Sequence, residues 1–279
     1  MFGNNYYTLV AGLREYTLDS DTKGFDATEI VAEILEQISA SDASAVRLLY
    51  GYYDCENLIA LRAGRAAYNP LGNISQEDLA DELVSPSRLP KSMAAVVKAY
   101  AEAEGEGDES EKVDMTIGFE KALLTAYYKE CSRSGSRFMR NWSEFDRTLR
   151  NVAAAAVARS TDRNVGDSLI GEGDIVGQLR RSSAADFGLR GELSYVDAVI
   201  SAVNDETNMV EKEHKIDLVR WEQAGELALF DYFNIDAILS YLVKINIVAR
   251  WSLLDPKRGR EMLERIMADL DGKDLINKQ

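Results

Sequence analysis

Histidine and cysteine are almost absent from this sequence of 279 residues, which has one histidine, His214, and two cysteines, Cys55 and Cys131. One histidine is too few for a zinc site with several histidine ligands, and no Ser or Cys nucleophile motif accompanies it for a catalytic triad. Two cysteines are too few for a disulfide framework in a chain of this length, so we expect both to be reduced. We interpret His214 as a solvated residue of a charged helix.

Phosphate-binding motifs are missing as well. Gly171, Gly173 and Gly177 are spaced superficially like a dinucleotide-binding loop, but an alanine-rich helix is predicted upstream where that loop needs a strand. The aspartates between Asp269 and Asp274 lack the twelve-residue calcium loop with its terminal Glu. The sequence therefore predicts a protein that is not an enzyme and has no catalytic, metal-binding or cofactor-binding residues.

Long apolar runs and an excess of basic residues are also lacking. The longest apolar stretch, Ile235 to Leu254, is interrupted by Asp236, Lys244 and Arg250, which are costly at the centre of a bilayer. The net charge of -15 disfavours nucleic acid, because binding to its phosphates requires clustered Lys and Arg. Since the N-terminus shows no signal-peptide pattern, we expect a cytoplasmic protein without a membrane span.

Helical periodicity dominates the rest of the sequence. Apolar residues recur at helical spacing from Phe233 to Trp251, with Asn234 at the expected N-cap. Long helices are also predicted from Ser143 to Arg159 and from Asp205 to Tyr232, and a short one around Ile175 to Leu179. The fold class predicted is all-α.

Two predictions concern the ends of the chain. The Tyr- and Thr-rich segment from Asn5 to Leu18 predicts a short extended segment before the helices. Beyond Pro256, apolar residues between Met262 and Leu270 predict a second helix, which would form a C-terminal hairpin with the helix before it.

An aromatic residue followed by a capping residue occurs three times, as Tyr53-Asp54, Trp142-Ser143 and Phe233-Asn234. The caps are 89 residues apart (143 minus 54) and 91 residues apart (234 minus 143), which is close to one third of the chain. The spacing predicts three similar helical subdomains in a pseudo-threefold arrangement, and chance is the alternative. The predicted division, in which the units can pack as one domain, is 1–100 for unit 1, 101–114 for an acidic linker, 115–190 for unit 2 and 191–279 for unit 3.

Charge of opposite sign gathers in two places. Residues 102–114 contain seven acidic side chains and one Lys, whereas residues 133–163 contain seven Arg and three acidic side chains. The arginines allow two interpretations, a solvated helix face paired to acids elsewhere or a docking surface for an acidic partner. Under the second interpretation, the candidate partner contacts are Arg137, Arg140, Arg147 and Arg150, with Lys244 and Arg250 from later in the chain.

Four segments carry a family resemblance: YYTLVAGL near the N-terminus, DCENLIALR from Asp54, FMRNWSEFDRTLRNVAAA from Phe138 and DAILSYLVKINIVARW from Asp236. They resemble an uncharacterised bacterial family encoded among the subunits of V/A-type ATPases. That family is similar to the C subunit of archaeal-type ATPases, which is called d in eukaryotic vacuolar enzymes. The residues that match the C and d patterns are Asp54, Asn57 and Leu58, followed by Tyr241, Leu242, Lys244 and Arg250. The Glu expected after Lys244 is missing, which weakens the link to the C and d proteins more than the link to the bacterial family.

The resemblance implies a non-catalytic, all-helical funnel of three similar subdomains, like the C and d proteins. Its partners would be the central-shaft subunits and the proteolipid rotor ring, which it would couple on the cytoplasmic face of the inner membrane as a peripheral subunit. Two other functions are open. One is an acidic all-helical interaction module unrelated to ATPases. The other is an all-helical enzyme that binds an anionic substrate through the region from Arg133 to Arg163.

Overall fold

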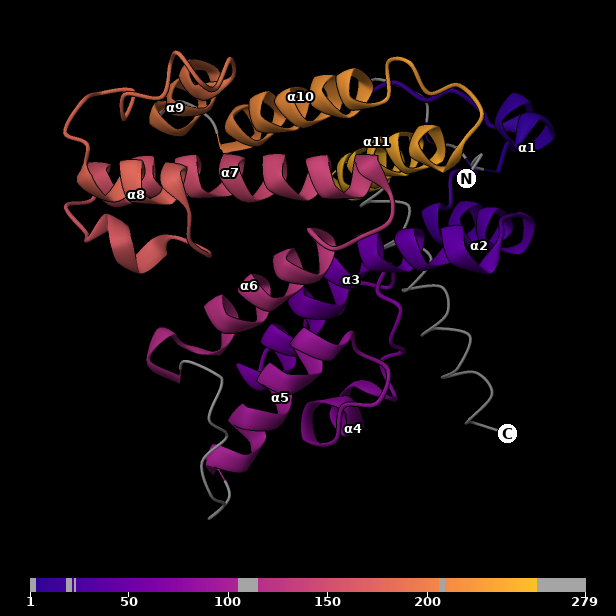
Figure 1. Cartoon of the computed structure of the whole chain (residues 1–279), viewed down its shortest axis with the longest axis horizontal. Coiled ribbons are helices and arrows are strands. Elements are labelled where there is room, and N and C mark those ends of the chain that lie inside the picture. The colour runs from indigo at the N-terminus through magenta and orange to yellow at the C-terminus, as the bar shows by residue number, and fades with distance from the viewer. Residues whose placement is uncertain (1–3, 19–21, 23, 105–114, 206–208, 255–279) are drawn as a thin grey trace, which may run out of the picture.

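The computed structural model describes residues 4–18, 22, 24–104, 115–205 and 209–254, and every regular element among them is helical. The all-α prediction is therefore confirmed for this part of the chain. In chain order (Figure 1), the helices are α1 (Tyr7–Gly12), α2 (Ala27–Gln37), α3 (Ala40–Arg62), α4 (Leu79–Val84), α5 (Lys91–Glu104), α6 (Phe119–Cys131), α7 (Arg137–Ser160), α8 (Asp174–Arg181), α9 (Val196–Asn204), α10 (Met209–Leu227) and α11 (Ile235–Leu254), with single 3-10 turns at Met115–Ile117 and Val165–Ser168. None of the described helices is both long and apolar enough to cross a membrane.

The three long helices α3, α7 and α11 begin with the same local device. The residue before each helix is Ser39, Ser136 or Asn234, and its side-chain oxygen accepts a hydrogen bond from the backbone N–H three residues later, at 3.3, 3.0 and 3.1 Å respectively. Such a cap satisfies one of the N–H groups that the first turn of a helix leaves without a partner. The prediction that Asn234 caps a core helix is confirmed.

The other two predicted caps are wrong, because Asp54 lies inside α3 and Ser143 lies inside α7. Their polar atoms bind partners that are not a helix start. The Asp54 carboxylate accepts from the backbone N–H of Ile74 at 3.0 Å, and the Ser143 hydroxyl donates to the carbonyl of Arg140, one turn back, at 2.9 Å. A capping residue type before an apolar run is thus not sufficient to mark where a helix begins.

Expectations for the remaining elements have mixed outcomes. The extended segment predicted near the N-terminus is wrong in part, since residues 7–12 form α1, whose start is held by a hydrogen bond from the Tyr6 N–H to the Phe233 carbonyl. The short helix near Ile175 and the long helix before Phe233 are confirmed as α8 and α10. Residues 101–104 of the predicted linker belong to α5. Its remaining residues from 105 on, and the hairpin helix predicted after Pro256, lie outside the described residues.

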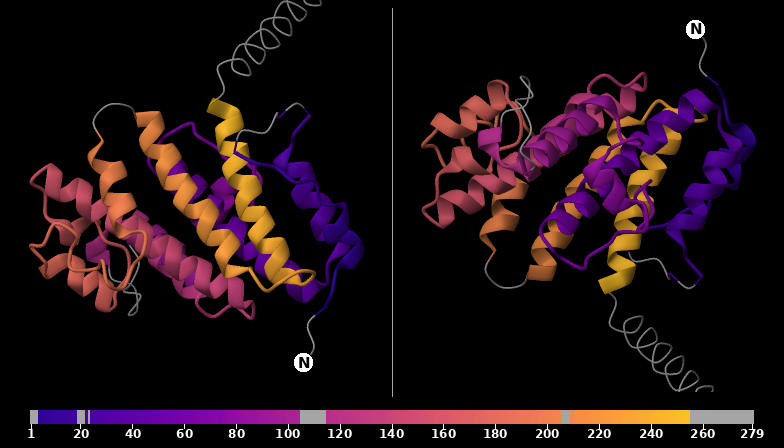
Figure 2. Two further views of the ribbon diagram at one scale, coloured as in Figure 1. Left: turned by 90° about the horizontal axis from the view of Figure 1, so that it is seen from above. Right: turned by 90° about the horizontal axis from the view of Figure 1, so that it is seen from below.

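Three helices each directly precede a long helix in the chain, α2 before α3, α6 before α7 and α10 before α11, and we call each such two a helix pair. The first helix of each later pair packs on the long helix of the pair before it, so α6 contacts α3 and α10 contacts α7. α2 in turn contacts α11, and Figure 2 shows α10, α11 and α2 side by side. α5 packs against α6, and α9 packs between α7 and α10. The first and last pairs therefore meet.

Helix α7 supplies much of the core. Its buried face carries Phe138, Trp142, Phe145, Leu149 and Val152, spaced alternately four and three residues apart, as expected for one stripe of an amphipathic helix. Burial of each large apolar side chain contributes about 1.5–3 kcal/mol. Because this face joins a cluster that runs from α2 to α11, α7 forms a rigid base for the surfaces around it.

Candidate functional site

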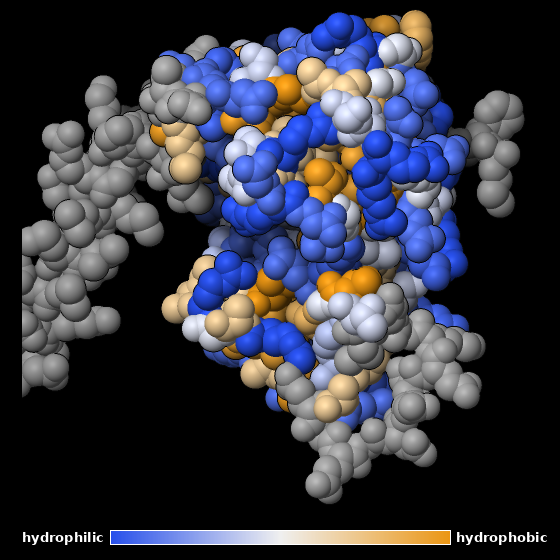
Figure 3. Space-filling view, turned by 90° about the vertical axis from the view of Figure 1, so that its left-hand side faces the viewer, coloured by the Kyte–Doolittle hydropathy of each residue, from blue (hydrophilic) through white to orange (hydrophobic). Residues whose placement is uncertain are grey.

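A cleft of about 1130 Å³ lies between α3 and α6 on one side and α7, α10 and α11 on the other. All three long helices and all three first helices of the pairs contribute to its lining. Figure 3 looks at the end of the molecule that is on the left in Figure 1, where apolar atoms are visible in a hollow between the upper and the lower helices. The cleft is therefore the place where the three helix pairs meet.

The lining of the cleft is largely apolar, with a charged group at one side. Leu49, Leu124 and Ile247 come from three different helices, while Ala153 and Ala154 on α7 leave space because their side chains are small. An apolar concave surface with a few convergent polar groups is typical of binding sites. The cleft thus has the character of a site for another molecule.

One edge of the cleft is a loop clamped onto α3. The Asn57 side chain accepts from the backbone N–H of Asn69 at 2.7 Å and donates to the carbonyl of the same residue at 2.9 Å. Gly72 lies so close that a Cβ there would come within 2.8 Å of both the Asn57 and the Asp54 side chains. Asn151 on α7 makes the same pair of bonds to the backbone of Ile170, at 2.8 and 2.9 Å. Both connections are fixed by helix side chains rather than by strands.

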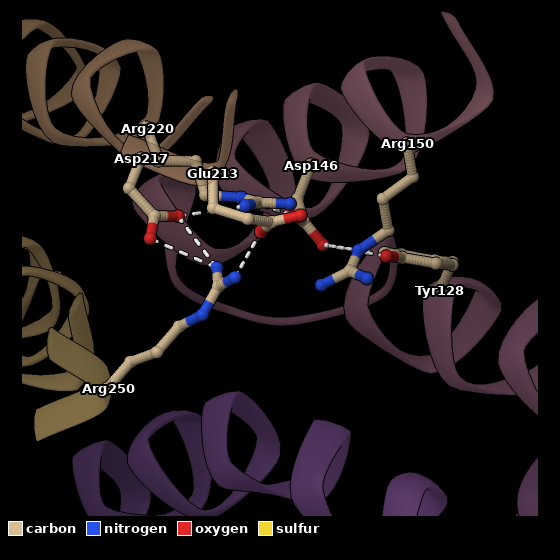
Figure 4. A network of polar contacts seen from close by, with 7 residues as sticks. All are labelled: Tyr128, Asp146, Arg150, Glu213, Asp217, Arg220 and Arg250. Atoms are coloured by element: carbon tan, nitrogen blue, oxygen red, sulfur yellow. Dashed lines mark hydrogen bonds and ion pairs between the residues drawn. The ribbon is translucent and has the colours of Figure 1, made fainter. Parts of the chain in front are cut away.

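The charged side chains at one side of the cleft form a network, and the first carboxylate in it is that of Asp146 on α7 (Figure 4). Its carboxylate accepts hydrogen bonds from Tyr128 Oη at 2.7 Å, Arg150 Nε at 2.8 Å and Arg220 Nε at 3.4 Å. Arg150 also lies over the ring of Tyr52, with its guanidinium carbon 4.3 Å from the ring centre, in a cation–π contact. These bonds connect α3, α6, α7 and α10.

The network continues through Asp217 of α10, which is almost fully buried. Its carboxylate accepts from Arg220 Nη1 at 3.0 Å, Arg250 Nη1 at 3.0 Å and Trp251 Nε1 at 2.9 Å. Arg250 also pairs with Glu213. The three acids and three arginines balance in charge, and α11 is tied to α10 by them.

The pKa values follow from this pairing. Burial acts to raise the pKa of Asp146, but the nearby Arg150 and Arg220 outweigh it and hold the pKa below the usual value of an aspartate. Burial acts to lower the pKa of Arg150, and the Asp146 carboxylate outweighs it and raises that pKa. Both side chains are therefore charged at neutral pH. A carboxylate with a lowered pKa is a weak proton acceptor, so this arrangement is suited to holding helices together rather than to proton transfer.

The six predicted partner contacts lie in several places. Arg137 pairs with Asp231, and its Nε lies 3.8 Å from Asp236. Arg140 donates to the carbonyls of Ser134 at 2.6 Å and Gly135 at 3.1 Å. These two arginines therefore lie in the first turn of α7 and bind groups around its start.

The other four predicted contacts are on α7 and α11. Arg147 donates to both oxygens of Glu144 at 2.8 Å, and Lys244 lies 5.3 Å from the centre of the Trp221 ring, where burial lowers its pKa. Only Arg150 and Arg250 are brought together, as members of the network. As contacts to a partner, all six remain predictions.

The sequence interpretation missed the acids of the network and Arg220. A local signal was present, because Asp146 and Arg150 are four residues apart and Asp217 and Arg220 are three apart, and residues at these spacings are neighbours on a helix. Of the arginines in residues 133–163, only Arg150 lines the cleft. That region does not supply the group of arginines around one pocket that an anionic substrate would need.

Comparison with known proteins gives one family. Residues 3–273 match a family described as "Protein of unknown function (DUF2764)". No curated protein matches the chain.

The resemblance to V/A-type ATPase subunits, including the C and d proteins, is therefore wrong, because the match over nearly the whole chain is to this family and not to a family of ATPase subunits. The residues that suggested it have local roles in the fold. Asp54 and Asn57 hold the loop at residues 69–74. The Tyr241 hydroxyl donates to the Arg14 carbonyl at 3.1 Å, and Arg250 belongs to the ionic network. Short polar motifs of this kind arise wherever a helix must fix a loop or a neighbouring helix.

Proposed function

We propose that this chain, which belongs to the DUF2764 family of unknown function, is a non-catalytic structural subunit. It would bind a partner protein in its central cleft. The observation that carries the proposal is the cleft itself, an apolar hollow of about 1130 Å³ bordered by all three helix pairs. The proposed assembly is a V/A-type rotary ATPase, in which the protein would couple the central-shaft subunits to the proteolipid ring from the cytoplasmic side. What supports this choice is the all-helical body around a central cleft, which suits a coupling subunit, and not descent from the C and d proteins.

We further propose that the helices form three similar units in a pseudo-threefold arrangement. The caps of the long helices support it, since Ser136 follows Ser39 by 97 residues (136 minus 39) and Asn234 follows Ser136 by 98 (234 minus 136). In the first two units, a first helix and a long helix are followed by two shorter ones. The units would then be α2–α5, α6–α9 and the part of the chain from α10 onward, which assigns α9 to the second unit.

The way the units contact each other supports the same proposal. Each first helix packs on the long helix of the unit before it, and α2 of the first unit packs on α11 of the third. Such a closed ring places the cleft at its centre. A coupling subunit must transmit force without deforming, and a close-packed core with helices connected around a ring resists deformation.

The ionic network adds to this stiffness. Asp146 pairs with Arg220 and so connects α7 to α10, and Asp217 pairs with Arg250 and so connects α10 to α11. Bonds in which both partners are charged are about twice as strong as neutral ones. Because the acids and arginines already bind one another, the apolar lining is left as the main surface for a partner.

The test is reconstitution with purified shaft subunits and, separately, with the isolated proteolipid ring of a V/A-type ATPase. Two variants alter the cleft, Ala153→Trp, which reduces its volume, and Val157→Asp, which puts a charge on a lining residue that is 43% exposed. Val84→Trp is the matched control, because Val84 is an exposed apolar residue that is not part of the cleft. Circular dichroism and thermal melts of each variant check that it is folded.

We expect the wild-type protein and the control to co-elute with the shaft subunits, and both cleft variants to lose that binding. Failure of the wild-type protein to bind either the shaft or the ring would refute the role in the ATPase. Binding that both cleft variants retain would refute the cleft as the site.

A further inference from the structure

A second surface, away from the cleft, is formed by large apolar side chains at the turn between α10 and α11. Leu229, Phe230, Tyr232 and Phe233 follow one another closely in this turn, and Tyr7 of α1 packs against Phe233 with its ring centre 4.7 Å away. All five are exposed, Phe230 to 82%. Figure 1 shows α1 beside the turn at the right-hand end of the molecule. We call these five residues the aromatic patch, and none of them lines the cleft.

The turn does not need aromatic residues to form. The connection between α6 and α7, at the same place in the second helix pair, consists of Ser132 to Ser136 with the sequence SRSGS. The connection between α2 and α3 is only Ile38 and Ser39. Both connections end in a serine cap, as the aromatic turn ends in Asn234. Since polar residues close an equivalent turn, the exposed aromatic side chains require another explanation.

The accessible charged side chains next to the aromatic patch are mainly arginines. Asp231 and Asp236 have side chains only 13% and 10% exposed, because Arg137 and other groups of the chain cover them. Arg133 in the adjoining α6–α7 turn is exposed, and so are Arg137 and Arg140 in the first turn of α7. Among the residues that the structure describes, Arg133 and Arg140 form no ion pair.

An exposed acid near the aromatic patch is Glu226, at the end of α10. Arg137 is paired with Asp231, but Arg133 and Arg140 against this one glutamate leave the accessible edge of the patch with an excess of positive charge, in a protein whose net charge is -15. A molecule that contacts the patch from the side of α7 therefore meets apolar rings and arginines together.

We propose that the aromatic patch is a protein-binding surface whose partner presents an apolar face edged with Asp and Glu. Aromatic residues and arginine are the types most enriched at protein interfaces, and they carry most of the binding energy there. A second copy of this chain fits less well, because its own patch would bring the same arginines against these. An extended anionic lipid surface also fits less well, because it meets the net charge of the whole protein, whereas a partner with acids around one apolar face meets mainly the patch and its edge. The site goes beyond the proposed role of the cleft and does not depend on it.

The probes are two synthetic amphipathic helices with the same leucine face, one with Glu along both edges of that face and the other with Lys. Their binding to the full-length protein is measured by fluorescence anisotropy. Phe230→Asp disrupts the aromatic patch, and the double variant Arg133→Glu with Arg140→Glu reverses its edge. Val84→Asp is the matched control, since it places the same charge on an exposed apolar residue of α4, far along the chain. Thermal melts check the fold of every variant.

The Glu-edged peptide should bind the wild-type protein and Val84→Asp equally, and at least tenfold more weakly to Phe230→Asp. The double arginine variant should prefer the Lys-edged peptide. Equal binding of the two peptides to the wild-type protein, or unchanged binding to Phe230→Asp, would overturn the proposal. Sedimentation with vesicles of phosphatidylcholine and phosphatidylglycerol that depends on Phe230, without binding of the Glu-edged peptide, would also overturn it and indicate a lipid surface.

Discussion

Replacement of Asp146 by Asn tests whether the ionic network stabilises the fold. The substitution keeps the shape of the side chain but removes the charge that Tyr128, Arg150 and Arg220 share. Removing one partner of a buried ion pair costs about 3–5 kcal/mol, because the remaining charge stays buried without compensation. Arg220 keeps Asp217 as a partner, and Arg150 keeps its contact with the Tyr52 ring. We therefore expect a loss of about 3 kcal/mol, at the low end of that range.

The assay is urea unfolding, followed both by far-ultraviolet circular dichroism and by tryptophan fluorescence. Trp251 is a useful reporter because its indole N–H donates to Asp217 within the network. Coincidence of the two transitions establishes two-state unfolding, which the free-energy difference requires. The control is Asp197→Asn, which removes an exposed acid paired with Arg190 at the surface and should leave the unfolding midpoint unchanged. A loss below about 1 kcal/mol for Asp146→Asn would refute the argument from burial and pairing.

The same substitution has a defined pH dependence. Since the pKa of Asp146 is lower in the folded protein than in the unfolded chain, its stabilising contribution is fully present above the unfolded value of about 3.9. The contribution is lost as the pH falls through the lower, folded value. The stability difference between wild type and Asp146→Asn should thus be constant from pH 7 to pH 5 and shrink in stronger acid. A difference that grows on acidification would contradict the assigned direction.

Three further predictions concern single groups. Ser136→Ala should lower the free energy of unfolding by about 1 kcal/mol, because it removes the cap of α7 and a hydrogen bond to Asp236; a thermal melt unchanged from wild type would contradict this. Asn151→Ala should lower the free energy of unfolding by about 2 kcal/mol, since it leaves the backbone N–H and carbonyl of Ile170 without their partners. The loop after residue 160 should then be cleaved faster by a protease, and cleavage at the wild-type rate would contradict the role of Asn151 in holding that loop. Burial raises the pKa of the Cys131 thiol to about 12 and that of Cys55 well above its usual value. A thiol reagent at pH 8 should therefore label neither cysteine until urea unfolds the protein. Rapid labelling of the native protein would contradict this and show that the helices around the cysteines open.

Helix α11 could be located from sequence because its apolar stripe, its single good cap and its end are all local features. The start of α7 could not, since Ser132, Ser134 and Ser136 are equally good capping residues in one short segment, and packing decides among them. Asp54 does fix local structure, but it is not the helix cap that the sequence predicted. Its carboxylate binds the backbone of a loop that returns twenty residues later, and no local pattern shows such a return.

The cleft illustrates the same limit. The pairing of Asp146 with Arg150 is visible as a helical spacing, whereas that of Asp146 with Arg220 spans 74 residues. Whether a charged residue on a helix faces water or another helix depends on tertiary packing. Arg150 and Arg250 could therefore be proposed as contacts from sequence, but not as partners within one network.

Contacts between the N-terminal part of the chain and the region of α11 have a consequence for biosynthesis. The Tyr50 hydroxyl donates to Asn246 across 196 residues at 2.9 Å, and the Tyr6 N–H binds the Phe233 carbonyl. On the ribosome, α2 and the residues just before it emerge early, but Phe25 and Ala27 cannot be buried against α11 until that helix has been made. Contacts between such distant segments form slowly and leave apolar surface exposed in the meantime. A nascent chain stalled before α11 is thus the form in which we expect chaperones and proteases to act on this protein.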